Sequence, residues 1–454
     1  MTDADLSAAR EALPSEWKRA FDWVERELGG RITRFERQAR WRPAWFLDLE
    51  RNGETVPLYW RGDRGEADHG VYPLDHEYRV LQVLEAHDIP VPHPYGFCEE
   101  PRGMLLARAP GRANLATAES EAERDSVQDH YMELLARMHQ IDLAAFEAIG
   151  LERPKTEEQL GLGDFDSWEK AYRGFKCRPE PWIEFAIRWI RRNVPKGRDQ
   201  PSFLTCDAGQ FLFESGRVTC VLDLELAYLG DPAADLAGMR CRDLSEPLGS
   251  LARAVSRYEE FSGQSIDRRV IDYHSVRFGL CTPMVCAHLV TNPSADVSFA
   301  QYLAWYLVYG RCPLEIIAEL EGVEIPSPEL PDASPSRYTP AHDYVLASLK
   351  EDEPDARSYE MDQTLRAAQY ARRADLYGRE LEAQDLDEAE KILGQRPANA
   401  AECDAALEAF VLDAEPVRDA ELVRYFTRHI LRQEFLLGPA ARELEGVHFQ
   451  PISG

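Results

Sequence analysis

Apolar and polar positions alternate along residues 31–60, which is the pattern of half-buried β-strands. The run contains RITRFERQARWR, PAWFLDLE and ETVPLYWRG, and Asn52-Gly53 separates the last two. Asn-Gly favours a tight hairpin turn, so the pattern predicts three antiparallel strands. GMLLAR predicts one more short strand. Between them, a helix is predicted over residues 74–87 from apolar residues at helical spacing: Leu74, Tyr78, Leu81 and Leu84.

Helical spacing dominates the rest of the chain, with one interruption by short strands at residues 201–222. An acidic amphipathic helix at the N-terminus ends at Gly29-Gly30. Residues 324–340 are rich in Pro and Ser and predict a linker. We therefore expect four parts in chain order: an N-terminal helix (1–30), an α+β lobe (31–107), a mainly helical lobe (108–325), and a separate all-helical module for packing or oligomerisation (341–454).

Composition narrows the class of protein. The 454 residues are 44% hydrophobic and 29% charged, with a formal net charge of −28. Such a charge repels nucleic acids and anionic membrane surfaces, which argues against both as partners. The negative charge either serves solubility or attracts a cationic substrate, and the net charge alone does not distinguish these two roles. Neither a signal core nor a run of ~18 apolar residues is present, so the sequence predicts a cytoplasmic protein.

The nine cysteines are an odd number and form no CxxC pair. Several lie within apolar stretches. This pattern predicts reduced, mostly buried thiols rather than disulfides or a zinc site.

Polar residues converge at one edge of a predicted hairpin in residues 204–235, LTCDAGQFLFESGRVTCVLDLELAYLGDPAAD. QFLF and VTCVLD are its strands, so Gln210 and Asp223 lie at the same end, and Asp207 precedes Gln210 by three residues. Two carboxylates and an amide oxygen suit Mg²⁺. A carboxylate beside a metal-held triphosphate can accept the proton of an attacking hydroxyl. Singly, each Asp is more often an ordinary turn residue, but the combination favours phosphoryl transfer.

This segment resembles the catalytic core of the aminoglycoside phosphotransferase/choline kinase-like family, which is related to the protein kinases. That family shows HGDxxxxN, a short hairpin, Asp-x-Glu and GDPxxDLA. The matching pieces here are TCD, Gln210, Asp223-Leu224-Glu225 and GDPAADLA. PLDHEYRVLQVLEAHDIPVPHPYG, MLLARAPG and LLARMHQID extend the resemblance over residues 31–320. It implies a bilobal, protein-kinase-like α+β fold with a small antiparallel-sheet N-lobe and a mainly helical C-lobe.

The resemblance also implies an activity: ATP- and Mg²⁺-dependent phosphorylation of a hydroxyl on a small-molecule alcohol. Asp207 is then the catalytic residue that orients and deprotonates this hydroxyl. Arg61, at the end of the third strand, neutralises the nucleotide phosphates and is positioned by Glu77. The implied metal group contains Gln210, Asp223 and Glu225.

The chain departs from the family pattern around the catalytic loop. Thr205 and Cys206 replace the family's His and Gly, Gln210 replaces its Asn, and the loop is two residues shorter. Loss of the family's His would loosen the loop. The side chain of Gln210 is longer than that of Asn, so its amide oxygen can still reach a metal from the shorter loop. Arg61 replaces Lys and can bind phosphate in a bidentate fork. The basic turn at residues 37–42 either covers phosphates or is solvated. Both an active kinase and a nucleotide-binding pseudokinase or scaffold remain open.

The substrate and several nearby residues leave alternatives. RWRPAW and QFLF resemble the branch associated with acyl-CoA metabolism, which implies a hydroxyacyl-CoA-like substrate; an aminoglycoside would suit the acidic charge. Arg240 and Arg242 either meet an anionic substrate or form surface ion pairs. We expect Asp231 and Asp235 to hold the loop after the metal site, with Asp235 capping the next helix, and His139 to be a packed helix residue. Homo-oligomerisation through the C-terminal helices is left open.

Overall fold

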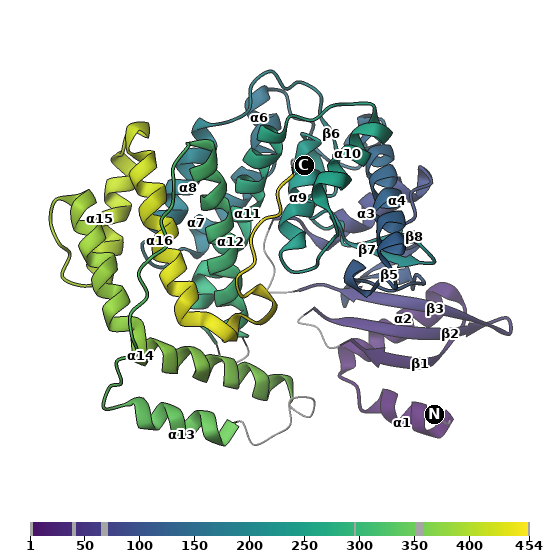
Figure 1. Cartoon of the computed structure of the whole chain (residues 1–454). Coiled ribbons are helices and arrows are strands. Elements are labelled where there is room, and N and C mark those ends of the chain that lie inside the picture. The colour runs from purple at the N-terminus through teal and green to yellow at the C-terminus, as the bar shows by residue number, and fades with distance from the viewer. Residues whose placement is uncertain (1–2, 39–41, 65–70, 295–296, 350–357, 453–454) are drawn as a thin grey trace.

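The N-terminal lobe is a five-stranded antiparallel sheet with the order β1-β2-β3-β5-β4, and α3 connects its third and fourth strands along the chain (Figure 1). Its elements are β1 (Arg31–Arg37), β2 (Ala44–Arg51), β3 (Glu54–Gly62), α3 (Leu74–Ala86), β4 (Pro94–Glu99) and β5 (Arg102–Ala107). The residues that this computed structural model describes are 3–38, 42–64, 71–294, 297–349 and 358–452.

The hairpin between β2 and β3 turns where the sequence predicts it. Arg51 pairs with Glu54, and the two residues between them, Asn52 and Gly53, both have positive φ, at 54° and 83°. This left-handed backbone matches the twist of the flanking strands, which is why Asn-Gly is favoured there. The three predicted strands and the helix after them are confirmed.

The N-terminal segment is two helices, so the expectation of one helix was wrong. α1 (Asp3–Glu11) ends before Pro14, and α2 (Ser15–Leu28) begins directly after it. A proline lacks the backbone N–H that a helix interior needs, and here it precedes the first turn of α2. α2 ends at Gly29, as predicted, with φ at 67°. It packs on the sheet with its apolar face: Trp17, Ala20, Phe21, Val24 and Leu28.

The second lobe is mainly helical. Its short strands form two small pairs, β6 with β9 and β7 with β8. The sequence predicted the β7–β8 hairpin but missed the β6–β9 pair, because three-residue strands joined over a long loop leave no periodic pattern. The elements are α4 (Glu121–His139), α5 (Leu143–Glu147), α6 (Glu157–Leu162), α7 (Phe165–Phe175), α8 (Pro181–Arg192), β6 (Ser202–Leu204), β7 (Phe211–Glu214), β8 (Arg217–Val221), β9 (Tyr228–Gly230), α9 (Ala233–Asp243), α10 (Leu251–Ser262), α11 (Arg268–Thr291) and α12 (Phe299–Leu320).

The C-terminal helical module packs against this lobe and shares its hydrophobic core (Figure 1). The cluster that fills α8, α11 and α12 continues into the module through residues such as Leu386, Leu407 and Phe426. Arg311 of α12 is fully buried and pairs with Glu434 at 2.9 Å. The predicted linker carries no helix or strand over residues 324–336. The module contains α13 (Thr339–Leu349), α14 (Tyr359–Leu393), α15 (Ala400–Asp413) and α16 (Asp419–Leu437).

Two further expectations bear on the chain as a whole. All nine cysteines are free thiols, and eight of them are buried, as predicted. Among the described helices, none combines the length and the apolar character that crossing a lipid bilayer requires.

Candidate active site

The β7–β8 hairpin brings the expected polar residues to one end. Leu222 donates its backbone N–H to the carbonyl oxygen of Gln210 at 3.0 Å, so Gln210 and Asp223 lie side by side. The amide nitrogen of Gln210 in turn donates to Asp207 Oδ2 at 2.9 Å. The sequence therefore predicted the convergence of these three residues correctly.

Two residues of this site hold a left-handed backbone: Cys206 with φ at 68° and Asp223 with φ at 59°. Such a conformation costs a non-glycine residue about 1–3 kcal/mol and persists only where its surroundings enforce it. For Cys206, the enforcing contacts come from Asp235, whose carboxylate accepts the backbone N–H groups of Thr205 at 2.9 Å and Cys206 at 2.8 Å.

Asp235 thus braces the loop at Thr205 and Cys206, and the expectation that it caps α9 was wrong. It lies in the first turn of α9, with its carboxylate turned back to the loop because two buried N–H groups need an acceptor. Asp231 accepts the N–H of Ala233 at 3.0 Å at the start of that helix. His139 Nε2 lies 3.1 Å from Asp235, so His139 is a packed structural residue, as expected. These contacts hold the loop at Thr205 and Cys206, where Thr205 replaces the family's His.

The close packing of α9 on this loop depends on Gly238. A Cβ atom there would lie 2.1 Å from the carbonyl oxygen of Cys206. We expect Gly238→Ala to lower the free energy of unfolding by about 1–3 kcal/mol, because backbone has to move. Denaturant unfolding measures this. The control is Gly174→Ala in α7, where a Cβ meets nothing within 4 Å and stability should rise by up to ~1 kcal/mol. Equal stability of the Gly238 variant and the unchanged protein would contradict the packing.

Arg61 joins the two lobes at the site. It is buried at the end of β3, and its Nε lies 2.8 Å from Glu77 Oε2 of α3, so the expected pair is present. Its Nη2 lies 3.0 Å from Glu225 Oε2 and also bonds Asp223. Leu224 donates its N–H to Glu77 Oε1 at 3.2 Å. The Arg61 guanidinium and the Glu77 carboxylate therefore both connect the N-terminal lobe to the Asp-x-Glu segment.

Two more arginines contact Glu225, Arg42 and Arg64. Of the basic turn at residues 37–42, residues 39–41 lie outside the described part of the chain. Arg42 is buried and bound to Glu225, so it is not solvated. Sequence reasoning missed Arg64. The available signal was the presence of basic residues close to the end of the third strand.

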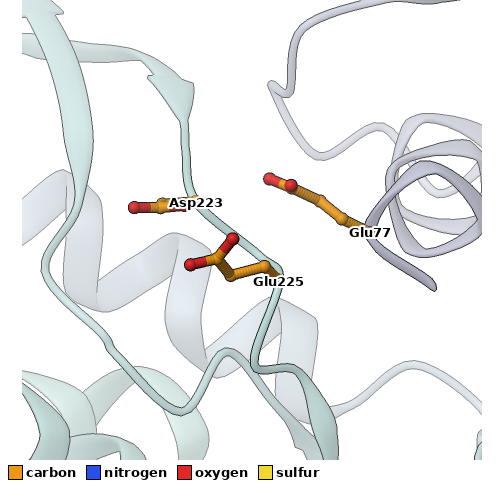
Figure 2. A group of neighbouring side chains, drawn as sticks. All are labelled: Glu77, Asp223 and Glu225. Carbon is orange, nitrogen blue, oxygen red and sulfur yellow. The ribbon is translucent and has the colours of Figure 1, made fainter. Parts of the chain in front are cut away.

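A group of three carboxylates could hold a metal ion: Glu77, Asp223 and Glu225. One oxygen from each lies within 4.8 Å of the others. Figure 2 shows Glu77 reaching from its helix towards the loop that carries the other two. Carboxylate oxygens are the hard ligands that Mg²⁺ prefers, so this donor set fits the expected ion. Glu77, expected only on the nucleotide side, joins the group, whereas the Gln210 amide nitrogen is directed at Asp207.

Burial and charge set the ionisation of these groups. Burial raises the pKa of Glu77 to about 7, against the opposing charge of Arg61. Burial also opposes ionisation of Asp223, but the adjacent Arg61 outweighs it and holds the pKa of Asp223 well below its ordinary value. Burial raises the pKa of Asp207, with the charge of Arg242 acting in the opposite direction. Asp223 is therefore the carboxylate most firmly held in the ionised form that a cation binds.

The two arginines of α9 have different surroundings. Arg240 pairs with Asp272 at 2.7 Å, donates to the carbonyl oxygen of Gln450 and lies over the Phe449 ring, which makes it structural. Arg242 donates its Nε to Asp207 Oδ1 at 3.2 Å, and its Nη2 bonds the other oxygen. Arg242 therefore neutralises the proposed catalytic carboxylate directly.

Comparison with known proteins gives the same family. The model of the phosphotransferase enzyme family (APH) matches residues 68–277. Acyl-CoA dehydrogenase family member 10 of Mus musculus is 26% identical over 181 residues, which are 37% of this chain and 16% of that protein. Member 11 of Rattus norvegicus is 25% identical over 207 residues, 43% of this chain and 26% of that protein. The chain thus spans less than a third of these relatives' length.

A solved structure shows the same fold. A Ralstonia eutropha JMP134 protein, described provisionally as an aminoglycoside phosphotransferase, superposes with a TM-score of 0.50 at 19% identity. The match covers 66% of this chain and 98% of the other. Residues 68–277 therefore match the phosphotransferase enzyme (APH) family, and the superposition shows its kinase-like fold.

Proposed function

We propose that this protein transfers the γ-phosphoryl group of ATP to a hydroxyl group of a small molecule, with Mg²⁺ as cofactor. The observation that carries the proposal is the placement of Asp207 beside the carboxylate group of Glu77, Asp223 and Glu225, with Arg61 buried among them. Family membership supports phosphoryl transfer in general. The substrate and the individual residue roles are the parts that we propose.

Each side chain then has a defined task. Bound Mg²⁺ would be held by Asp223 and Glu225 and would neutralise charge on the nucleotide phosphates. Asp207 orients the substrate hydroxyl and accepts its proton. Arg61 balances the carboxylates in this structure, and a bound divalent cation would compete with it for the same oxygens. A guanidinium released in this way can pair with phosphate oxygens.

We further propose that the substrate is an anionic alcohol of the hydroxyacyl-CoA type rather than an aminoglycoside. Arg242 supports this, because a cationic group beside Asp207 favours an anionic substrate and repels a polycation. Similar segments also occur in proteins named acyl-CoA dehydrogenase family members.

Arg242→Gln tests this substrate class. We expect the KM for 3-hydroxybutyryl-CoA to rise by roughly 10–100-fold, since a hydrogen bond to a charged group is worth about 1.5–3 kcal/mol. The kcat for neutral 1,3-butanediol should not fall, because Asp207 loses only its counter-charge. Arg242→Lys should restore the KM in part. An unchanged KM for the anionic substrate would rule out this role for Arg242.

A nucleotide-binding pseudokinase or scaffold is the second candidate, favoured by the altered TCDAGQ loop. Calorimetric titration with Mg–ATP, followed by turnover assays across a panel of alcohols and hydroxyacyl thioesters, separates the two. Binding together with product supports the kinase. Binding without product on any alcohol supports the pseudokinase, and no binding supports the scaffold.

A further inference from the structure

A cavity of about 630 Å³ lies between the helical lobe and the C-terminal module. Its walls come from α8 and α12 on one side and from α14, α15 and α16 on the other, the group of helices at the left of Figure 1. We call it the module cavity. Its volume falls within the roughly 300–1,000 Å³ of small-molecule sites. Its aromatic wall is made by Trp182, Phe299, Tyr306, Tyr370, Tyr425 and Phe426.

The module cavity is separate from the candidate active site. None of the residues that bind or flank the metal group lines it. Most of its wall also lies beyond residue 277, where the family match ends. The cavity therefore belongs to what this chain adds to the shared kinase-like fold.

Most polar groups of the cavity are already paired within the protein. Glu180 is buried, accepts from Arg178 Nε at 2.7 Å and is also bonded by the hydroxyl of Tyr306. Asp385 lies 2.6 Å from Arg432 Nη1 and 2.9 Å from His429 Nδ1. At the rim, Arg379 and Glu382 are both exposed and of opposite charge. The Glu180 and Asp385 pairs leave no strong charge free for a ligand, and water screens the exposed charges at the rim.

Asp404 of α15 is different. Its side chain lines the cavity, and it makes no hydrogen bond or ion pair with any part of the chain that the structure describes. Its pKa is raised by burial and by the neighbouring Asp385 and Glu408, with His429 and Arg178 opposing. Asp404 is half-buried beside the aromatic wall, so a cation from outside would supply the ion pair that the described residues do not make.

We propose that the module cavity binds a small organic cation with an apolar body. An ammonium or guanidinium head pairs with Asp404, and the body packs on the aromatic wall. Tyr and Trp rings attract a desolvated cation through their negative faces, which adds to the ion pair. A ligand held in this way contacts the helical lobe and the module together and stabilises their association. This proposal does not depend on the phosphoryl transfer.

Calorimetric titration of the full chain with 2-phenylethylammonium tests the charge of the ligand. Its neutral and anionic analogues, 2-phenylethanol and phenylacetate, are titrated alongside at about 0.15 M salt, where long-range attraction to the acidic surface is screened. The ammonium ion should bind at least roughly tenfold more tightly than either analogue. Equal or tighter binding of the alcohol or the carboxylate, or no binding of the ammonium ion, would overturn the proposal.

Asp404→Asn tests the partner. The substitution should weaken 2-phenylethylammonium binding by roughly tenfold or more, with little change in the melting temperature, since Asp404 makes no hydrogen bond or ion pair with the described residues. The control is Asp413→Asn, an equal charge change at an exposed position of the same helix. An equal loss of affinity in the control would show that the effect comes from the change in net charge. Loss of binding in Asp207→Asn would place the probe in the candidate active site, and either result rejects the cavity.

Filling the cavity is an independent test. Gly378 of α14 lines it, and a Cβ there meets nothing within 4 Å. Gly378→Leu should therefore fold, gain helix propensity and lose at least tenfold in affinity for the probe because the added side chain takes the space. The control is Gly174→Leu, an equally open helical glycine outside the cavity. Unchanged affinity in the Gly378 variant would reject the site.

Discussion

Replacing Asp207 by Asn is expected to lower kcat for phosphoryl transfer by roughly 10²–10⁴-fold, the usual contribution of a general base. The amide keeps the size of the carboxylate but no longer takes a proton, and it has one acceptor oxygen where Asp207 uses two. Asp207 contacts Gln210 and Arg242, and neither of these two residues belongs to the carboxylate group around Arg61. Nucleotide binding should therefore be unchanged in the variant. Steady-state assays and Mg–ATP calorimetry provide the two measurements.

The control for this variant is Glu214→Gln, an exposed carboxylate at the far end of the same hairpin, which should behave as the unchanged protein. Normal turnover of the Asp207 variant would remove its catalytic role. Loss of both turnover and nucleotide binding would assign it to the structure of the loop instead.

Asp207 also predicts the acidic limb of the pH profile. A general base works only when ionised, and burial raises the pKa of Asp207 above its ordinary value. As the pH falls, kcat/KM should therefore begin to fall at a higher pH than an ordinary aspartate would give. Arg242→Gln removes the opposing charge, so it should shift this limb further upward. A limb that does not move in the Arg242 variant would mean that another group titrates.

Asp223→Asn is expected to cause the largest loss of metal affinity. We expect Mg²⁺-dependent ATP binding to weaken by more than about 100-fold, beyond the 10–100-fold that follows from removing a residue that only supports a metal ligand. Asn is the appropriate substitution because Asp223 has a φ of 59°, a conformation that Asn tolerates and Ala does not. Arg61 keeps Glu77 and Glu225 as partners, so the variant should still fold.

The measurement is ATP calorimetry over a series of Mg²⁺ concentrations, with circular dichroism as the check on folding. Glu214→Gln again serves as the charge-matched control. A folded Asp223 variant with unchanged Mg²⁺ dependence would remove Asp223 from the metal group and leave Glu77 and Glu225 to be tested in turn.

Local chemistry made much of the fold predictable. The β2–β3 hairpin follows from alternation and Asn52-Gly53, and α3 follows from helical spacing. The break between α1 and α2 was missed although Pro14 signals it, because the acidic amphipathic pattern continues on both sides. The β6–β9 pair was missed because its two strands lie far apart in the sequence and have only three residues each.

The same difference between local and distant contacts explains which parts of the candidate site could be predicted. Asp207, Gln210 and Asp223 lie on one hairpin and the loop before it, so their convergence is a local property. Asp235 was assigned to the wrong contact because its partners, the N–H groups of Thr205 and Cys206, are fixed only when α9 packs on the loop at Gly238.

By itself, the sequence determined the strands and α3 of the N-terminal lobe and the residues of the β7–β8 hairpin, because periodicity and turn chemistry act over neighbouring residues. The kinase-like arrangement and the Asp-x-Glu segment followed from the resemblance of short motifs to a known family. Only the tertiary structure decided that Glu77 joins the carboxylate group, that Arg242 rather than Arg240 contacts Asp207, and that the C-terminal helices share a core and enclose a cavity with the helical lobe. These contacts join side chains from distant parts of the chain, and packing alone selects which polar groups are buried together.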